Sequence, residues 1–280
     1  MLKLALPNKG RLAEETRELF DDAGLPVQAR GERALSASLG GEFEAIFVRA
    51  QDIPEFVADG AADAGVTGWD LACESGRTLR DLLDLEFGSC RLVVAAREES
   101  GIAGLDDIRG ARRVATPFPR LARSFFDRMG IPVEVVPVSG AAEIAPHLGI
   151  ADIVVDLTST GSTLRVNGLR EVATVMGSSA RLIAGQETGR LAQLVAALTS
   201  VLRARGQRYV MANVPRAALE RLKAVLPGLN GPTVIDVMNG GDLVAVHAVA
   251  PACSIYRTIH DLKALGAQGI LVTRIERLMP

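Results

Sequence analysis

The 280-residue sequence predicts an α/β protein with two lobes around a central cleft and a smaller C-terminal domain. Short apolar runs alternate with stretches of helical periodicity, which is typical of sheets with mostly parallel strands. The alternation passes through two series of strands and starts again after the segment RARGQR at residues 203–208. No low-complexity segment interrupts it, so three folded parts are expected.

The first lobe is predicted over residues 1–88 with 180–206. Its strands are expected at Lys3–Leu6, Glu44–Val48 and Asp63–Thr67. A helical pattern over Leu12–Ala23 follows the first strand, and an amphipathic helix over Glu187–Arg205 closes the lobe.

The second lobe is predicted over residues 89–179. Its strands are expected at Arg91–Ala96, Arg113–Thr116, Val133–Val138 and Ile153–Asp156, with helices near Arg120–Met129 and Ala141–Leu148. The polar segment Glu171–Ala184 would return the chain to the first lobe. Ligands usually bind in the cleft between two such lobes.

Residues 207–280 follow the order βαββαβ, which places two helices on one face of an antiparallel sheet in a ferredoxin-like arrangement. The expected elements are strand Tyr209–Asn213, helix Arg216–Leu226, strands Val234–Val237 and Val244–Val249, helix Ile255–Leu265 and strand Gly269–Ile275. No catalytic constellation occurs among them, so a regulatory or structural role is expected.

Composition excludes several classes of function. The 31 basic and 33 acidic residues nearly cancel, so no net field attracts nucleic acid or an anionic membrane. No signal peptide or membrane-spanning run occurs, which predicts a cytoplasmic protein. The three cysteines and three histidines lack the spacing of a disulfide framework or a metal site.

The segment DIVVDLTSTGSTL, Asp152–Leu164, carries the main functional signal. A buried strand runs into a loop of hydroxyl residues around Gly161 and then into a helix. Backbone N–H groups, hydroxyls and the helix dipole would surround a phosphate there. Gly161 lets the backbone approach the ligand, and Thr163 lies in the first helical turn.

Two aspartates in the same segment suggest a sugar beside the phosphate. Asp152 and Asp156 are four residues apart, so on a strand they project from one face and could accept from sugar hydroxyls or metal-bound water. A plain capped turn would need only one or two of the five hydroxyls. The motifs of the P-loop and of the dinucleotide-binding fold are both missing.

The stretch EIAPHLGIADIVVDLTSTGSTLRVNGLREV, Glu143–Val172, resembles the signature of the ATP phosphoribosyltransferase family. Three other stretches are similar to the same family, NKGRL at 8–12, VRAQDIPEFVADGAADAGVTGWDL at 48–71 and LKALGAQGILVTRIERLM at 262–279. The resemblance covers the full chain, including the C-terminal domain that marks the long form of the family.

This resemblance implies an activity, a cofactor and partners. A ring nitrogen of ATP would displace pyrophosphate from phosphoribosyl pyrophosphate in the presence of Mg²⁺, as the first step of histidine biosynthesis. Histidine would act as feedback inhibitor, and the chain would form a homo-oligomer between dimer and hexamer. The implied catalytic part is a two-lobed fold like that of periplasmic binding proteins.

The resemblance also implies roles for individual residues. Those for the ribose and its 5-phosphate are Asp156, Thr158, Ser159, Thr160, Gly161, Ser162 and Thr163, with Glu143 and Asp152 assisting at the sugar or metal. Lys9 and Arg11 would face the pyrophosphate, because arginine forks match phosphate oxygens. The implied catalytic residues are Arg11, Arg33 and Arg49, with an ordinary exposed charge as the alternative for Arg33. Thr67 and Gly68 would contact the nucleotide, with Asp70 in support.

Asn213, Leu229, Thr233 and Ala248 match the family's effector-binding positions. Asn213 departs from members that carry Asp there, and a packing role for Leu229 and Ala248 is an equal alternative. For the whole chain, the two-lobed pattern also fits a solute-binding protein without catalysis. An effector-sensing regulator is disfavoured, because no basic helix-turn-helix segment occurs.

Overall fold

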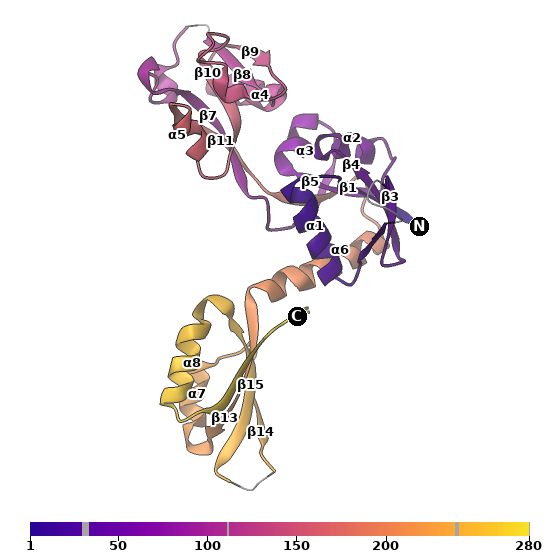
Figure 1. Ribbon diagram of the computed structural model, residues 1–280, viewed down its shortest axis with the longest axis vertical. Coiled ribbons are helices and arrows are strands. Elements are labelled where there is room, and N and C mark those ends of the chain that lie inside the picture. Colours follow the sequence, from indigo (N-terminus) through magenta and orange to yellow (C-terminus); the bar gives the residue numbers. More distant parts are fainter. Residues whose placement is uncertain (30–33, 111, 239–240, 280) are drawn as a thin grey trace. The chain divides into compact units, whose positions relative to one another are not determined.

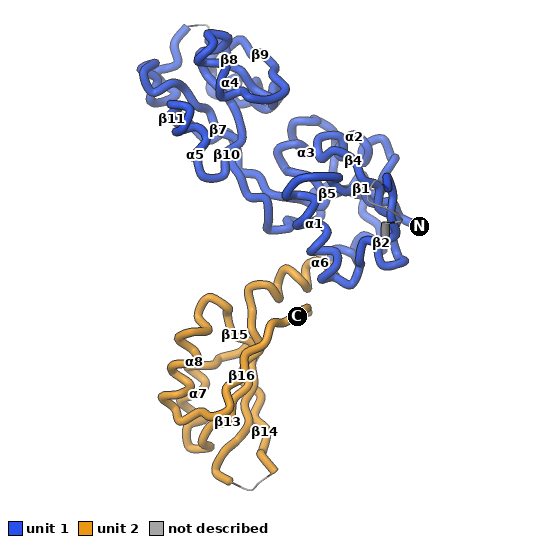
Figure 2. The backbone as a smooth tube through the Cα atoms, viewed as in Figure 1, with its two compact units in different colours: residues 1–195 blue, residues 196–280 orange. Residues whose placement is uncertain are grey.

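The computed structural model describes residues 1–29, 34–110, 112–238 and 241–279. Clustering of contacts divides the chain into two compact units, residues 1–195 and 196–280 (Figure 2). The division falls inside the long helix α6, Gly189–Arg205. No helix among the described residues is long and apolar enough to cross a membrane.

The first unit contains a seven-stranded sheet with the order β2-β3-β4-β1-β5-β12-β6. These strands are β1 Leu2–Pro7, β2 Val27–Ala29, β3 Ser36–Leu39, β4 Phe43–Val48, β5 Ala64–Gly68, β6 Arg80–Asp84 and β12 Ala180–Ala184. Helices α1 Arg11–Asp22, α2 Ile53–Ala58 and α3 Trp69–Ser75 connect them. Leu4, Leu6, Leu19 and Phe20 are almost fully buried, so β1 and α1 contribute to the same apolar core.

A second sheet in this unit has five strands in the order β11-β7-β10-β8-β9. They are β7 Cys90–Arg97, β8 Arg112–Thr116, β9 Val133–Pro137, β10 Ile153–Thr158 and β11 Leu169–Ser178, with helices α4 Pro119–Met129 and α5 Ser162–Val166. One core cluster packs Phe118, Phe125 and Phe126 against buried residues of β7, β8 and β10. The predicted α/β class is thereby confirmed.

The sheets are mixed, and the expectation of mostly parallel strands was wrong. Only β4-β1-β5 and β10-β8-β9 pair in parallel, and every other neighbouring pair in both sheets is antiparallel. The parallel strands form the centre of the first sheet. Their carboxyl ends therefore meet at one edge.

Two predicted segments differ in the structure. The helix expected at Ala141–Leu148 is only a 3-10 turn, η4 Ala142–Ile144, because Ala141 is left-handed (φ 50°) and Pro146 cannot donate a helical hydrogen bond. The polar return segment Glu171–Ala184 forms most of β11 and all of β12. The remaining 3-10 turns are η1 Ala50–Asp52, η2 Glu98–Ser100, η3 Leu105–Asp107, η5 Arg216–Ala218 and η6 Ala252–Ser254.

The chain passes between the two sheets through two crossing segments, residues 85–89 and Ser179. They lie beside each other, because Leu85 N–H donates to Ala180 O and Ala180 N–H donates to Phe87 O, both at 2.9 Å. Between these bonds Glu86 adopts a left-handed conformation (φ 62°), and its N–H donates to Asp84 Oδ1 at 2.9 Å.

The second unit carries an antiparallel sheet with the order β14-β15-β13-β16. The strands are β13 Gln207–Pro215, β14 Thr233–Asp236, β15 Leu243–Pro251 and β16 Gln268–Arg274, and the helices are α7 Leu219–Val225 and α8 Ile255–Ala264. Both helices lie on one face of the sheet (Figure 1). This confirms the predicted βαββαβ order.

Candidate functional site

The loop after β10 is held closed by its own residues. The buried Thr158 accepts the Gly161 N–H through its hydroxyl at 2.8 Å. Gly161 has φ +73°, a left-handed conformation that glycine adopts without strain. This bond links the end of the strand to the residue before α5.

The other hydroxyls of the loop point away from the core. Thr160 Oγ1 and Ser162 Oγ are 2.9 Å apart, and the hydroxyls of Ser159 and Thr163 bond to no residue that the structure describes. Because α5 has only five residues, its dipole is small. The donors of this loop are therefore its hydroxyls and its backbone N–H groups.

A pair of carboxylates lies near the end of β10. Asp156 is partly buried, and its Oδ1 accepts the Leu157 N–H at 2.7 Å. Burial raises the pKa of Asp156, the Leu157 hydrogen bond lowers it, and the negative charge of Glu143 raises it. Glu143 comes from η4, which contacts β10. Two neighbouring carboxylates can accept hydroxyl hydrogen bonds or hold a cation.

Asp152 does not join this pair, contrary to the expectation from its spacing. It precedes β10, a strand's length of about 20 Å from the loop. Its carboxylate accepts the Arg113 N–H at 2.9 Å and lies 3.3 Å from the Arg112 guanidinium. Its contacts therefore connect the amino-terminal ends of β10 and β8, which lie away from the loop.

Polar residues also follow the parallel strands of the first sheet. Pro7 pairs with Val48, and the Asn8 N–H donates to Val48 O at 2.9 Å, so the ends of β1 and β4 are adjacent. Lys9 and Arg49 come directly after these ends and are exposed. The Arg49 side chain has no bonding partner among the described residues.

Arg11 begins α1 and is 82% exposed at its side chain, with Nε 2.7 Å from Glu15 Oε1. Its guanidinium therefore has further donors free to bind a ligand. The predicted Arg33 lies outside the described residues.

Thr67 and Gly68 lie at the end of β5, beside β1. The buried Thr67 hydroxyl donates to Ala50 O at 2.7 Å, which joins this end to η1 after β4. A Cβ on Gly68 would lie 2.5 Å from Asp70 Oδ1. A larger residue at position 68 would therefore displace the Asp70 carboxylate that accepts from Ser178.

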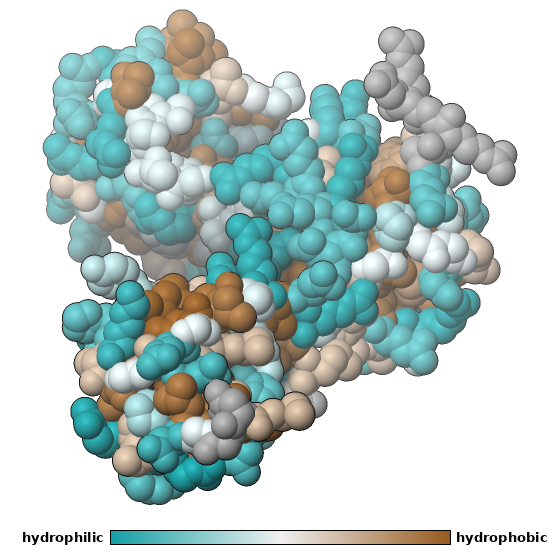
Figure 3. Space-filling model, turned by 60° about the horizontal axis from the view of Figure 1, so that its bottom comes forward, coloured by the Kyte–Doolittle hydropathy of each residue, from teal (hydrophilic) through white to brown (hydrophobic). Residues whose placement is uncertain are grey.

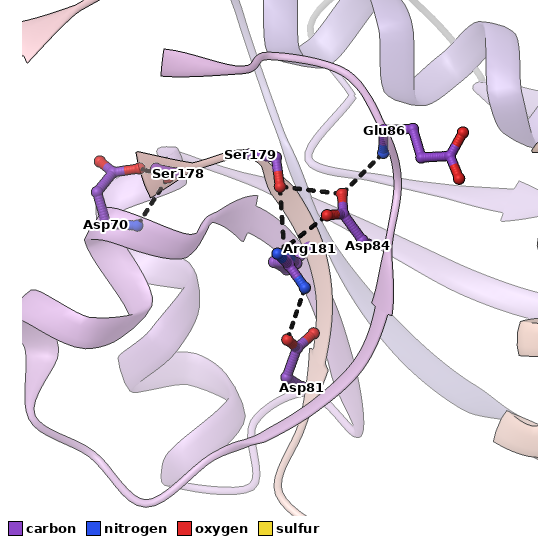
Figure 4. Close-up of polar contacts among 7 residues, drawn as sticks. All are labelled: Asp70, Asp81, Asp84, Glu86, Ser178, Ser179 and Arg181. Atoms are coloured by element: carbon purple, nitrogen blue, oxygen red, sulfur yellow. Dashed lines mark hydrogen bonds and ion pairs between the residues drawn. The ribbon is translucent and has the colours of Figure 1, made fainter. Parts of the chain in front are cut away.

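Asp70 links this turn to the second sheet. It is 4% exposed, accepts the Ser178 hydroxyl, and donates its own N–H to Ser178 Oγ at 3.0 Å (Figure 4). Burial raises the pKa of Asp70, and the Ser178 bond and the Asp70 backbone N–H lower it. Asp70 was predicted only to support the nucleotide turn, because its partner Ser178 is 108 residues away along the chain and no local pattern joins the two.

A second polar cluster surrounds Arg181 at the same place, and the sequence did not predict it. The guanidinium bonds Asp81 at 2.8 Å and Asp84 at 2.9 Å, while Ser179 Oγ donates to Asp84 at 2.9 Å (Figure 4). It also lies 5.7 Å from the centre of the Trp69 ring. The one sequence feature that pointed to this cluster was the charged Arg181 within the otherwise apolar strand β12.

The predicted effector residues fall into two pairs within the C-terminal unit. Strand register places Asn213 and Thr233 on the sheet face that the helices leave open, together with His247. Ala248 lies on the buried face, and a Cβ on Gly228, next to Leu229, would be 3.2 Å from the Ala248 methyl group. No group of three or more potential metal ligands occurs among the described residues.

Comparison with known proteins gives concordant matches. Residues 49–204 match the family model described as ATP phosphoribosyltransferase, and residues 204–277 match "HisG, C-terminal domain". The chain is similar to the ATP phosphoribosyltransferases of Gemmatimonas aurantiaca, at 69% identity, and Natronomonas pharaonis, at 48%. Each alignment covers all of both chains.

A solved structure agrees with these matches. A chain of the ATP phosphoribosyl transferase (HisG:HisZ) complex from Thermotoga maritima superposes with a TM-score of 0.63 and 26% identity. The superposition covers 71% of the present chain and 97% of that chain.

Proposed function

The chain belongs to the ATP phosphoribosyltransferase family, and from that premise we propose how its residues serve the transfer. The enzyme joins ATP to phosphoribosyl pyrophosphate and releases pyrophosphate. The reaction needs stabilisation of a cationic sugar centre and of a departing anion more than it needs a covalent nucleophile.

We assign the ribose 5-phosphate to the loop 158–163. The supporting observation is the bond from Gly161 N–H to Thr158, which shapes the loop while the hydroxyls of Ser159 and Thr163 have no partner among the described residues. Thr160, Ser162, Thr163 and Ser159 would donate to phosphate oxygens. Asp156, with Glu143 beside it, would accept from the ribose hydroxyls.

The pyrophosphate is assigned to the cations that follow β1 and β4. Arg49 is exposed and lacks a protein partner, so its full fork is free for phosphate oxygens. Lys9 and Arg11 add charge at the neighbouring strand end. Fixed positive charge stabilises the leaving group as its bond to the sugar breaks. Thr67 and Gly68, at the end of β5, would lie along the nucleotide.

The family requires a divalent cation, and we propose Mg²⁺. Magnesium usually binds through one or two carboxylates, with substrate phosphates and water completing its coordination. Asp156 and Glu143 supply such a pair. When bound, the ion would neutralise charge on the leaving pyrophosphate.

For the C-terminal unit we propose binding of histidine as inhibitor and a role in homo-oligomer formation, up to a hexamer. Asn213 and Thr233 share the open sheet face, which supports a ligand there. Met211, Ile235 and Leu271 of the same sheet are 40–58% exposed, and apolar surface gathers on this unit in Figure 3. Such surface is typical of contacts between subunits. We also propose a cytoplasmic location, in keeping with a biosynthetic role.

A single assay tests the proposed catalytic roles. Pyrophosphate release should require both ATP and phosphoribosyl pyrophosphate and should fall in Arg49→Ala. A two-lobed binding protein without catalysis would instead bind ligand and release no pyrophosphate. That outcome would overturn the proposal.

A further inference from the structure

Helix α3, Trp69–Ser75, follows strand β5 of the first lobe. It forms hydrogen bonds at both of its ends to residues at or beyond the boundary with the second lobe. At its start, Asp70 bonds Ser178 at the end of β11, and Trp69 N–H donates to Ser179 O at 2.9 Å. Near its end, Glu74 bonds the start of α4. A single short helix therefore connects the two lobes.

The Glu74 carboxylate caps the N-terminus of α4, where the preceding residue supplies no side-chain cap. The carboxylate accepts the Arg120 and Leu121 N–H groups, both at 2.9 Å. The N-cap residue of α4, Phe118, provides no side-chain hydrogen bond. An anion at this position satisfies two backbone donors and interacts favourably with the dipole of the 11-residue helix.

A glycine at the end of α3 also leaves room for the neighbouring Arg120 side chain. Gly76 ends α3 with φ +66°, and a Cβ there would lie 2.2 Å from the carbon of the Arg120 guanidinium. The absence of a side chain lets Arg120 lie over the end of α3. Two independent features of α3 therefore fit it to the first turn of α4.

The place of this contact relates it to the reaction. Helix α4 follows the carboxyl end of β8, and β8 pairs in parallel with β10, whose carboxyl end carries the loop 158–163. Helix α3 follows the carboxyl end of β5, directly after Thr67 and Gly68. Its two ends therefore connect the strand edge of the nucleotide turn with the strand edge of the phosphate loop.

We infer that Glu74 is a positioning residue for phosphoribosyl transfer: by capping α4 from the other lobe, it fixes the separation of the two substrate-bearing strand edges. The inference rests on the proposed function, which assigns the nucleotide to the first lobe, so ATP can bind without this contact. Phosphoribosyl pyrophosphate is assigned to both lobes, so its binding also depends on their separation. The transfer requires the adenine nitrogen to lie in line with the anomeric carbon. Glu74 therefore acts on turnover more than on ATP binding.

The test compares Glu74→Ala and Glu74→Gln in the full-length protein. Dissociation constants for ATP alone and for phosphoribosyl pyrophosphate with Mg²⁺ alone are measured by calorimetry, and kcat is measured with both at saturation. Misplacement of reacting groups by about 1 Å costs roughly a hundredfold in rate. We expect kcat to fall roughly ten- to a hundredfold in Glu74→Ala, with the dissociation constant for ATP within about threefold.

Glu74→Gln keeps one accepting oxygen and should recover part of the lost kcat. If Glu74→Ala fails to fold, Glu74→Gln carries the same comparison, because it preserves the side-chain volume. The matched control is Glu18→Gln, an exposed position on α1 with no bonding partner among the described residues. It should match the unmodified protein in every measurement.

Two results would overturn the inference. In the first, kcat of Glu74→Ala stays within twofold of the unmodified enzyme. In the second, the dissociation constant for ATP rises by tenfold or more, which would make Glu74 part of the nucleotide site.

Discussion

Two threonines of the loop 158–163, the proposed phosphate loop, carry the same side chain and have different surroundings. Thr158 is 7% exposed and bonds the buried Gly161 N–H, whereas Thr163 is exposed and its hydroxyl has no partner among the described residues. The first hydroxyl therefore maintains the loop, and the second is free for a ligand.

Thr158→Ala should lower the free energy of unfolding by about 1–3 kcal/mol, because a buried N–H loses its acceptor. Urea unfolding measures this loss. An unchanged midpoint would indicate that the loop holds its shape without the bond.

Thr163→Ala should change the unfolding free energy by less than about 0.5 kcal/mol, as is usual for surface positions. If its hydroxyl donates to phosphate, affinity for phosphoribosyl pyrophosphate should fall roughly ten- to a hundredfold, the equivalent of a charged hydrogen bond. Calorimetric titration gives the result. Unchanged affinity would exclude Thr163 from the phosphate contacts.

The buried Asp70 predicts a pH dependence of stability. Its folded-state pKa is raised above the ordinary 3.8, so the folded protein binds this proton more tightly than the unfolded chain. The corresponding stability is fully present below the unfolded pKa and is lost as pH rises through the folded one. Asp70→Asn keeps an acceptor for Ser178 and removes the titration.

The variant should therefore gain stability relative to the unmodified protein as pH rises from about 4 towards neutrality. Urea unfolding of both proteins across this range isolates the contribution of one side chain. Parallel curves would contradict the assignment.

At the scale of elements, the adjacent ends of β1 and β4 predict a specific kinetic effect. Arg49→Ala should lower kcat by roughly a hundredfold, within the range for loss of one transition-state donor, and should leave ATP affinity nearly unchanged. Arg49→Lys should restore activity only in part, because an ammonium group lacks the fork. A proportional loss of binding would instead place Arg49 at a ground-state contact.

The predicted strands of both sheets formed because their apolar runs are short and bounded by turn residues. β11 was missed because its bulges, between Glu171 and Ala173 and between Thr174 and Met176, break the alternation on which such predictions depend. The prediction of a helix over Ala141–Leu148 did not take into account that Pro146 cannot donate a helical hydrogen bond. The antiparallel pairing of the outer strands in both sheets was also missed, because the direction of pairing depends on the path of the chain more than on the local sequence pattern.

The part of the proposed site that is local in sequence could be predicted. The phosphate loop is contiguous in sequence, so its hydroxyls and Gly161 could be named from the motif alone. Asp152 was misplaced because its spacing from Asp156 suggested a shared face without showing which end of the strand carries the ligand. Contacts such as Glu74 with α4 join residues distant in sequence, and no local pattern contains them.

At the scale of the whole molecule, α6 contributes buried residues to both units. Leu191 and Leu194 precede the division, and Leu198, Val201 and Leu202 follow it. Leu278 N–H also donates to Ser200 O at 2.9 Å, which joins the C-terminal tail to this helix. Truncation after residue 206 would therefore expose apolar surface on α6.

A substitution tests regulation with less disturbance. Thr233→Trp fills part of the open sheet face and should abolish histidine binding in calorimetry, while turnover without histidine stays within about twofold, as expected for a surface change in a unit that carries none of the proposed catalytic residues. Inhibition that persists unchanged would place the effector site elsewhere. Histidine that never binds the unmodified protein would contradict the regulatory proposal itself.

The closed phosphate loop has a thermodynamic consequence. Ordering a backbone costs about 1–2 kcal/mol of conformational entropy per residue, and here that loss occurs during folding, before any ligand arrives. Binding should therefore show little entropic penalty from loop ordering and a favourable enthalpy from new hydrogen bonds. Weakening the Thr158–Gly161 bond would transfer part of that ordering to the binding step, where it would appear as a less favourable binding entropy.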